Sequence, residues 1–130
     1  MKTMQNRSKR TDRDDVERHL PLRPVACAVL AALADAPRPG IDVLDAVNAT
    51  VPGRPLLGPG TLYRVMRELR HDGLISRTEP DEAPGDERQV HHALTPLGQA
   101  VLRAELTRLQ RTILLAGSVD GRRGRPASER

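Results

Sequence analysis

The chain has 130 residues and a formal net charge of +4, and Tyr63 is its only aromatic residue because Trp and Phe are absent. This length allows one domain with a modest core, which must be built from Leu, Val, Ile and Ala. The composition excludes a surface on which nucleic-acid bases stack, since such a surface needs several aromatic faces. The single cysteine, Cys27, excludes an internal disulfide and fits a reducing compartment.

The distribution of charge and hydropathy further limits the partners and the cellular location that the protein can have. Residues 1–18 and 117–130 each carry a net charge of +2, so the segment between them is neutral. Any argument for DNA binding must therefore rest on how the charges cluster within that segment. The longest apolar run, Val25 to Ala34, is too short to span a bilayer, and residues 1–15 lack the apolar stretch of a signal peptide. We expect a cytoplasmic protein.

Hydrophobic spacing and turn residues predict four helices and two strands between two polar, disordered ends, residues 1–18 and 117–130. The predicted helices and strands are, in chain order, Pro24–Asp35, Ile41–Thr50, Pro59–Asp72, the strands Leu74–Thr78 and Gln89–Leu94, and a last helix from Pro96 to Leu115. The order of three helices, a hairpin and a helix indicates a winged helix-turn-helix domain over residues 19–95. The fold class is mainly α with a small β-hairpin, followed by a C-terminal helix over residues 96–116.

The third predicted helix has one apolar and one basic side on a helical wheel. The apolar side holds Leu62, Val65, Met66 and Leu69. The opposite side carries Tyr63, Arg64, Arg67, Arg70 and His71. A helix fits the major groove of DNA, where Arg can bond to guanine or pair with phosphate, and Gly60 would allow the backbone to approach a phosphate. A solvated helix face would also carry arginines, and it is the order of elements around this helix that favours DNA binding.

The stretch GPGTLYRVMRELRHDGLI, Gly58–Ile75, resembles the signature of the PadR family of winged helix-turn-helix transcriptional regulators. A second stretch, HHALTPLGQAVL at His91–Leu102, resembles the second wing strand of that family and the entry to its C-terminal helix. The matching residues are Gly60, Thr61, Leu62, Tyr63, Leu69, Gly73, Leu74, Leu94, Thr95 and Gly98. The resemblance covers about residues 20–115. It implies a homodimeric regulator that binds double-stranded DNA, usually a repressor, which in some members is released from DNA by a small-molecule effector.

Three positions depart from the family pattern. Gly40-Ile41 stands where the family usually has Gly-Tyr, and His91-His92 stands where it usually has paired tyrosines. The chain also lacks the Trp with which one family member binds drugs at its dimer interface. These departures leave the expectation of DNA binding intact, but they argue against an effector that binds by aromatic stacking.

The last predicted helix carries an apolar stripe with a heptad-like 4, 3, 4, 3 spacing. The stripe consists of Leu102, Leu106, Leu109, Ile113 and Ala116. About two heptads are too few to predict a coiled coil, and the same face could dock within the protomer. With the resemblance, we predict a homodimer whose interface includes Leu102, Leu106, Leu109 and Ile113.

The loop between the two predicted strands is acidic, which is unusual for a wing. It carries five carboxylates and no Lys or Arg between Arg77 and Arg88. Those carboxylates would repel a phosphate backbone within a Debye length of about 8 Å, so we predict that the loop tip points away from DNA and that the two arginines make the wing's phosphate contacts. The predicted DNA-binding residues are thus Gly60, Thr61, Tyr63, Arg64, Arg67, Arg70, His71, Arg77 and Arg88.

The sequence offers no set of residues typical of an enzyme or of a metal site. Its four histidines and Cys27 show no ligand spacing, and adjacent His91 and His92 on a strand would point to opposite faces. We therefore expect no catalysis, no metal and no cofactor. A winged-helix module that binds a protein and not DNA is the alternative function, which the neutral middle segment permits and the arginines of the third helix disfavour.

Overall fold

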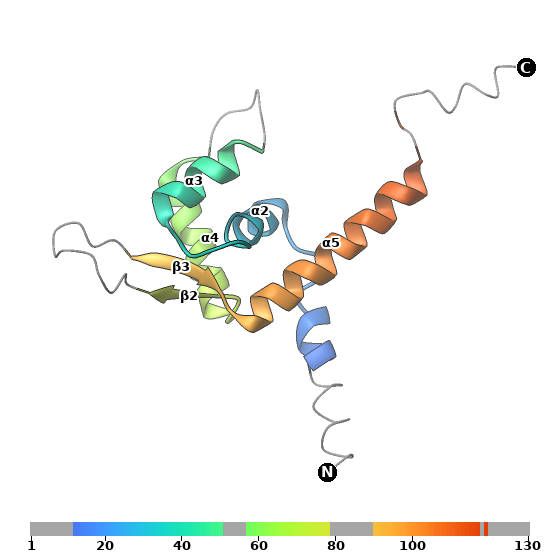
Figure 1. Cartoon of the computed structure of the whole chain (residues 1–130), viewed down its shortest axis with the longest axis horizontal. Coiled ribbons are helices and arrows are strands. Elements are labelled where there is room, and N and C mark those ends of the chain that lie inside the picture. Colours follow the sequence, from blue (N-terminus) through green and yellow to red (C-terminus); the bar gives the residue numbers. More distant parts are fainter. Residues whose placement is uncertain (1–11, 51–56, 79–89, 118, 120–130) are drawn as a thin grey trace, which may run out of the picture.

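The computed structural model describes residues 12–50, 57–78, 90–117 and 119 and has the predicted winged-helix architecture (Figure 1). Its elements are helices α2 (Pro24–Ala32), α3 (Gly40–Asn48), α4 (Pro59–His71) and α5 (Pro96–Ala116) and strands β1 (Arg38–Pro39), β2 (Ile75–Thr78) and β3 (His91–Leu94). All four predicted helices and both predicted strands are present. The largest error in their bounds is at α2, which ends at Ala32 and not at Asp35.

A third strand, β1, was not predicted. It pairs antiparallel with β3, so the sheet has the order β1-β3-β2 and the predicted hairpin supplies its middle strand and one edge. In register, His92 on the middle strand lies between Arg38 and Arg77 on the two edges. A strand of two residues leaves no alternating pattern, and Pro39 is tolerated there because β1 is an edge.

The N-terminal end differs from the expected disordered arm. Residues 12–17 are helical, and Val16 in this segment packs against the core. This apolar contact stabilises the segment. The rest of the two predicted disordered ends, residues 1–11, 118 and 120–130, lies outside the described residues.

The core is aliphatic, as the composition requires. Helix α2 lies at its centre and contacts α3, α4 and the first half of α5, as Figure 1 shows. The buried apolar residues are Val29, Leu30, Leu33, Val43, Val47, Leu62, Met66, Leu69, Leu74, Ile75, Val101 and Leu102. Val65 is half-buried at its edge. None of the helices in the described ranges combines the length and apolar content needed to cross a bilayer.

The end of α4 is fastened to the start of α5 through backbone geometry. Gly73 has φ of 79°, and the N–H groups of Gly73 and Leu74 donate to the carbonyls of Arg70 (3.0 Å) and Leu69 (2.9 Å), which is a Schellman cap. Thr95 caps α5 by accepting from the Gly98 N–H at 2.9 Å, and its hydroxyl donates to the Gly73 carbonyl at 2.6 Å. A Cβ on Gly98 would overlap the Leu74 carbonyl oxygen and lie 2.9 Å from its carbonyl carbon, so only glycine fits.

The start of α4 is held by the end of α3. The Asn48 side chain accepts from the Leu57 N–H at 2.7 Å and donates to the Leu57 carbonyl at 3.1 Å. A side-chain amide that satisfies both backbone groups of one residue fixes the chain just before α4. Helix α4 is therefore constrained at both ends, which is what a rigid binding element needs.

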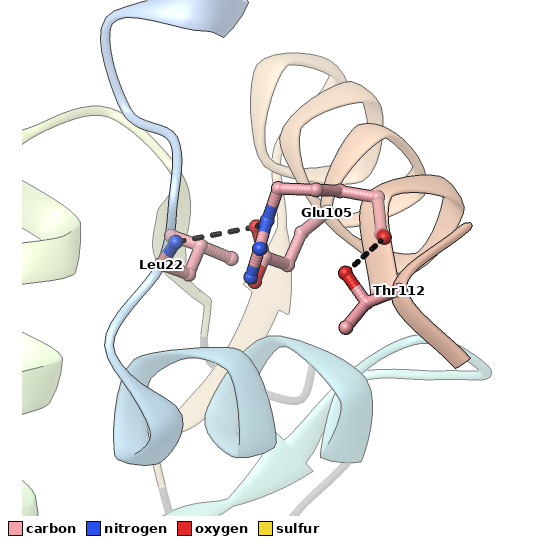
Figure 2. Close-up of polar contacts among 4 residues, drawn as sticks. Leu22, Glu105 and Thr112 are labelled. Carbon is pink, nitrogen blue, oxygen red and sulfur yellow. Dashed lines mark hydrogen bonds and ion pairs between the residues drawn. The ribbon is translucent and has the colours of Figure 1, made fainter. Parts of the chain in front are cut away.

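One buried charge lies between the N-terminal segment and α5 (Figure 2). Glu105 is 1% exposed, accepts from the Leu22 N–H at 3.3 Å and receives two hydrogen bonds from Arg108 at 3.0 and 2.7 Å. Hydrogen bonding to Arg108 lowers the pKa of Glu105 in spite of its burial. Cys27 packs against the core nearby, and burial raises the pKa of its thiol.

Candidate nucleic-acid interface

Helix α4 has the two faces that its sequence predicts. Leu62 and Met66 are at most 1% exposed in the core. The opposite face consists of exposed side chains, namely Thr61, Tyr63, Arg64, Arg67 and His71. Gly60, at the exposed start of the helix, has open space around it, so nothing within the described protein requires a glycine there. The exposed side of the helix is mainly basic, and Glu68 is its one exposed acidic side chain.

The exposed face of α4 forms a ridge between two grooves. One groove, of about 470 Å³, separates α4 from the sheet and the start of α3, and we call it the helix–sheet cleft. The other, of about 990 Å³, separates α4 from residues 19–26. Arg67 lines both grooves and so stands on the ridge, while Arg64 and His71 face the second groove. A convex basic ridge of this kind suits insertion into a groove of DNA.

Tyr63 is held on the flank of the ridge by Gly40. Tyr63 is 49% exposed. A Cβ on Gly40 would lie 3.0 Å from the Tyr63 Cε1 and 3.1 Å from its hydroxyl oxygen, which shows how closely the ring covers the first residue of α3. The side chain is therefore positioned for a contact in the helix–sheet cleft. Ile41, where the family pattern has Tyr, is 55% exposed beside it.

Arg70 is more buried than Arg64 and Arg67, the other two arginines of the predicted reading face. Arg70 is half-buried and lines the helix–sheet cleft together with Arg77 of β2 and His92 of β3. Arg77 itself is exposed, as a phosphate contact requires. Arg88 and the acidic loop, Glu79–Glu87, lie outside the described residues, so the predictions about them stay predictions.

His92 is the residue of this site that the sequence reasoning did not select. It is 7% exposed on the middle strand. Burial lowers its pKa, and the charges of Arg70 and Arg77 and the neighbouring His91 lower it further. The alternation of Val90, His92 and Leu94 was the available signal, because it places the histidine on the same face as two apolar residues.

The predicted dimer face of α5 is divided between core and solvent. Leu102 is 5% exposed and packs within the protomer, although it also lines a groove of about 340 Å³ along α5. Leu109 is half-buried and Leu106 is 44% exposed. Beyond them Ile113 is 65% exposed, as are Leu114 and Leu115 to still larger fractions. The second half of α5 extends away from the rest of the molecule (Figure 1).

The described residues contain no group of three or more His, Cys, Asp or Glu side chains placed to hold a metal ion. The site therefore consists of basic, aromatic and backbone groups of α4 and the sheet. Its chemistry is that of hydrogen-bond donors and positive charge. Such a site binds anions by position and charge.

This arrangement defines a winged helix-turn-helix protein with an exposed basic recognition helix. The family model of the transcriptional regulator PadR-like family matches residues 29–104, more than half of the chain. The chain belongs to that family of transcriptional regulators. No curated protein matches it.

Solved structures share the fold at low sequence identity. A PadR family transcription regulator from Clostridium difficile R20291 has 16% identity and a TM-score of 0.62, over 72% of this chain and 94% of that one. Bacillus subtilis PadR, in complex with operator DNA, has 19% identity and a TM-score of 0.55, over 66% of this chain and 47% of that one. Bordetella bronchiseptica BpsR, whose DNA binding is regulated by 6-hydroxynicotinic acid, has 20% identity and a TM-score of 0.56, over 85% of this chain and 74% of that one.

Proposed function

We propose that this protein is a homodimeric repressor that binds double-stranded DNA sequence-specifically with α4 in the major groove. The observation that carries the proposal is the exposed basic face of α4, opposite a face that is buried in the core. Membership of the PadR-like family supports a regulatory role. Bacillus subtilis PadR, which shares the fold, has been solved with operator DNA bound.

Each part of the ridge has a role in this proposal. Arg64 and Arg67 are exposed one turn apart on α4 and read base edges or bind nearby phosphates, while Thr61 and His71 lie at the ends of the same exposed face. Gly60 at the exposed helix start lets the backbone N–H groups approach a phosphate. Tyr63 and the arginines that line the cleft bind the DNA backbone. The Schellman cap at Gly73 and the Asn48–Leu57 hydrogen bonds before the helix start keep these groups in register.

Dimerisation uses the second half of α5. Ile113, Leu114 and Leu115 are at least 65% exposed there, and a surface of this kind is typical of an interface. The groove lined by Leu94, Leu102 and Leu106 continues this apolar surface toward the core. In a symmetric dimer the two α4 helices would lie about 34 Å apart and read a near-palindromic operator. Occupancy of that operator would exclude the transcription machinery, which is the repressor role.

The test is a genomic pull-down followed by titration. The full chain is incubated with sheared genomic DNA, and recovered fragments are sequenced for a near-palindromic motif. Fluorescence anisotropy then compares a duplex of that motif with a scrambled duplex of the same length at 50–200 mM salt. We expect at least about 10³-fold tighter binding of the motif and an affinity that falls steeply with salt. Salt-independent or undetectable binding to every duplex would instead support a protein-binding module.

A further inference from the structure

We propose that the helix–sheet cleft is a binding site for one oxyanion, held by the guanidinium groups of Arg67, Arg70 and Arg77 and by the imidazole of His92. The oxyanion is a phosphodiester of the DNA backbone or the phosphate, sulfate or carboxylate group of a small molecule, since these share the same chemistry. The phosphodiester source rests on the proposed DNA-binding function. The cleft itself is a feature of the protomer and can be tested without DNA.

The first support is a group of cations that has no counterion among the described residues. The residues that line the cleft include three arginines and a histidine, and none of them is acidic. Within the described ranges the ion pairs join Arg18 to Asp15 and Arg108 to Glu105, so none reaches the cleft arginines. Converging guanidinium groups repel one another, and an oxyanion that accepts their hydrogen bonds removes that repulsion.

The second support is the state of His92. Its side chain is more than nine-tenths buried, and its Nδ1 has no hydrogen-bond partner and almost no access to solvent. A buried N–H without a partner costs more than an unused lone pair, so we place the ring proton on Nε2. Because His92 lines the cleft and Nδ1 is inaccessible, Nε2 is the ring nitrogen that can donate to a bound anion.

The charges that surround His92 come from every element next to it. Arg70 approaches from α4, Arg77 from β2 and His91 from its own strand, and Arg38 is its register partner on β1. The Nε of Arg38 is likewise buried without a hydrogen-bond partner. All of these groups are cationic or neutral, so they disfavour an imidazolium. A bound oxyanion reverses the sign of the local field.

This geometry links anion binding to proton uptake. Burial and the neighbouring arginines lower the pKa of His92 in the empty cleft, and protonation also places a proton on the partnerless Nδ1. The negative charge of a bound anion offsets these costs, favours the protonated ring and raises that pKa. Between the two pKa values, binding takes up a proton, so the affinity for the anion increases as the pH falls. Each unit by which the pKa rises corresponds to about tenfold tighter binding to the protonated protein.

The cleft is also larger than an inorganic anion requires. Its volume of about 470 Å³ lies in the range of ligand pockets, and Ile41, Met66 and Val90 give it an apolar wall. A small organic anion would therefore fit with its charged group at the arginines. Because the same cleft adjoins the ridge of α4, such an anion would compete with DNA, and the cleft would then be the place where an effector acts.

The experiment follows the imidazole signals of the full chain by NMR between pH 5 and 8, with sodium chloride exchanged for sodium sulfate at constant ionic strength. Sulfate is the probe because its charge does not change in this range. We expect sulfate to raise the pKa of His92 by about one unit and to bind more tightly at low pH. Arg77→Gln, at an exposed position, should abolish the rise, and Arg13→Gln, which removes the same charge from the exposed surface of the N-terminal helix, should leave it intact.

A second arm adds duplex DNA in place of sulfate. A rise in the His92 pKa with DNA, with or without one for sulfate, supports a phosphodiester site. A rise with sulfate alone supports a site for a small-molecule oxyanion, and it does so even if no duplex binds and the proposed function fails. No rise with either ligand overturns the oxyanion site. If the same sample still binds DNA with a salt dependence, the proposed function stands without it.

Discussion

Helices α4 and α5 bury one face each in the same aliphatic core, but their free faces differ in chemistry. The free face of α4 carries Arg64 and Arg67, while the free face of α5 ends in Ile113, Leu114 and Leu115. A charged face is well hydrated and needs no further burial in a single protomer, so a partner binds it through opposite charge. An apolar face exposed to this extent favours a partner that removes it from water.

Because of this difference, the two helices depend on the rest of the protein in different ways. Burial of a Leu or Ile side chain contributes about 1.5–3 kcal/mol, so the three exposed residues at the end of α5 could together stabilise a dimer considerably. The arginines of α4 need precise placement instead, which the cap at Gly73 and the hydrogen bonds between Asn48 and Leu57 supply. We infer that α4 provides specificity and that α5 provides assembly.

The largest effect is expected when charge is placed on the apolar face of α5. The double substitution Leu106→Asp and Ile113→Asp should convert a dimer into a folded monomer, because carboxylates cannot be buried in an apolar seam without a partner. A penalty of about 4 kcal/mol would raise the dimer dissociation constant on the order of 10³-fold. Light scattering at micromolar concentration measures the mass, and circular dichroism confirms the helices.

The matched control for this variant is Arg13→Asp. It changes the net charge by the same two units, and Arg13 is exposed on the helical segment of residues 12–17, outside α5. This variant should keep the wild-type mass. If the double variant also keeps the wild-type mass, the face of α5 through Leu106 and Ile113 is not the dimer interface. The assembly role that we infer for α5 would then be wrong.

The next effect concerns the joint between the two helices. Gly98→Ala would push a methyl group into the Leu74 carbonyl, so we expect a loss of about 3 kcal/mol in the free energy of unfolding. Gly60→Ala is the control, because the space around Gly60 is open and alanine favours a helix. It should leave stability equal or slightly higher. Urea unfolding measures both, and equal stability of the two variants would show that α5 does not need this close approach.

The sequence predicted these two helices well because their boundaries are local. Pro59 and Pro96 start them, Gly73 ends the first one, and hydrophobic spacing identifies the buried faces. The buried stripe of α4 was predicted residue by residue, with Val65 only half-buried. These features depend on neighbours within a turn or two of helix, which a single sequence contains.

The remaining features depend on contacts between distant segments. Strand β1 exists because it meets β3, and Arg70 turns from the ridge into the cleft because β2 and β3 lie beside α4. The helical period specifies the side on which Arg70 lies but not the neighbour it finds there. Leu102 likewise belongs to a regular stripe, yet it is buried within the protomer, because α5 packs against α2 and the core.

Removing the arginines of the ridge should weaken DNA binding without affecting the fold. Arg64→Ala with Arg67→Ala should cost about 1–3 kcal/mol for each arginine that reads a base, and should relax sequence preference locally. Both side chains are exposed, so the midpoint of thermal unfolding should remain within a few degrees of wild type. Anisotropy with the operator and with single-mismatch duplexes measures the change, and Arg103→Ala on α5 is the control. Unchanged operator affinity would show that Arg64 and Arg67 do not contribute to operator recognition.

The smallest effect should separate the stability of α5 from the binding function of α4. Glu105 is buried, and its hydrogen bonds with Arg108 and Leu22 are lost in part in Glu105→Gln, which should lower the free energy of unfolding by about 1–2 kcal/mol at pH 7. The folded protein lowers the pKa of Glu105 below its ordinary value of 4.5, so the carboxylate contributes stability above that pH and loses it as the pH falls through the lower folded value. The stability difference between wild type and variant should therefore shrink on acidification from pH 5 downward. Glu68→Gln, at an exposed position of α4, should show neither the loss nor the pH dependence. Operator affinity of the variant at pH 7 should be unchanged, because the ion pair lies on α5 and leaves the ridge intact. Urea unfolding between pH 3 and 7 measures the stability difference. A difference that stays constant with pH would mean that Glu105 acts through packing and not through its charge.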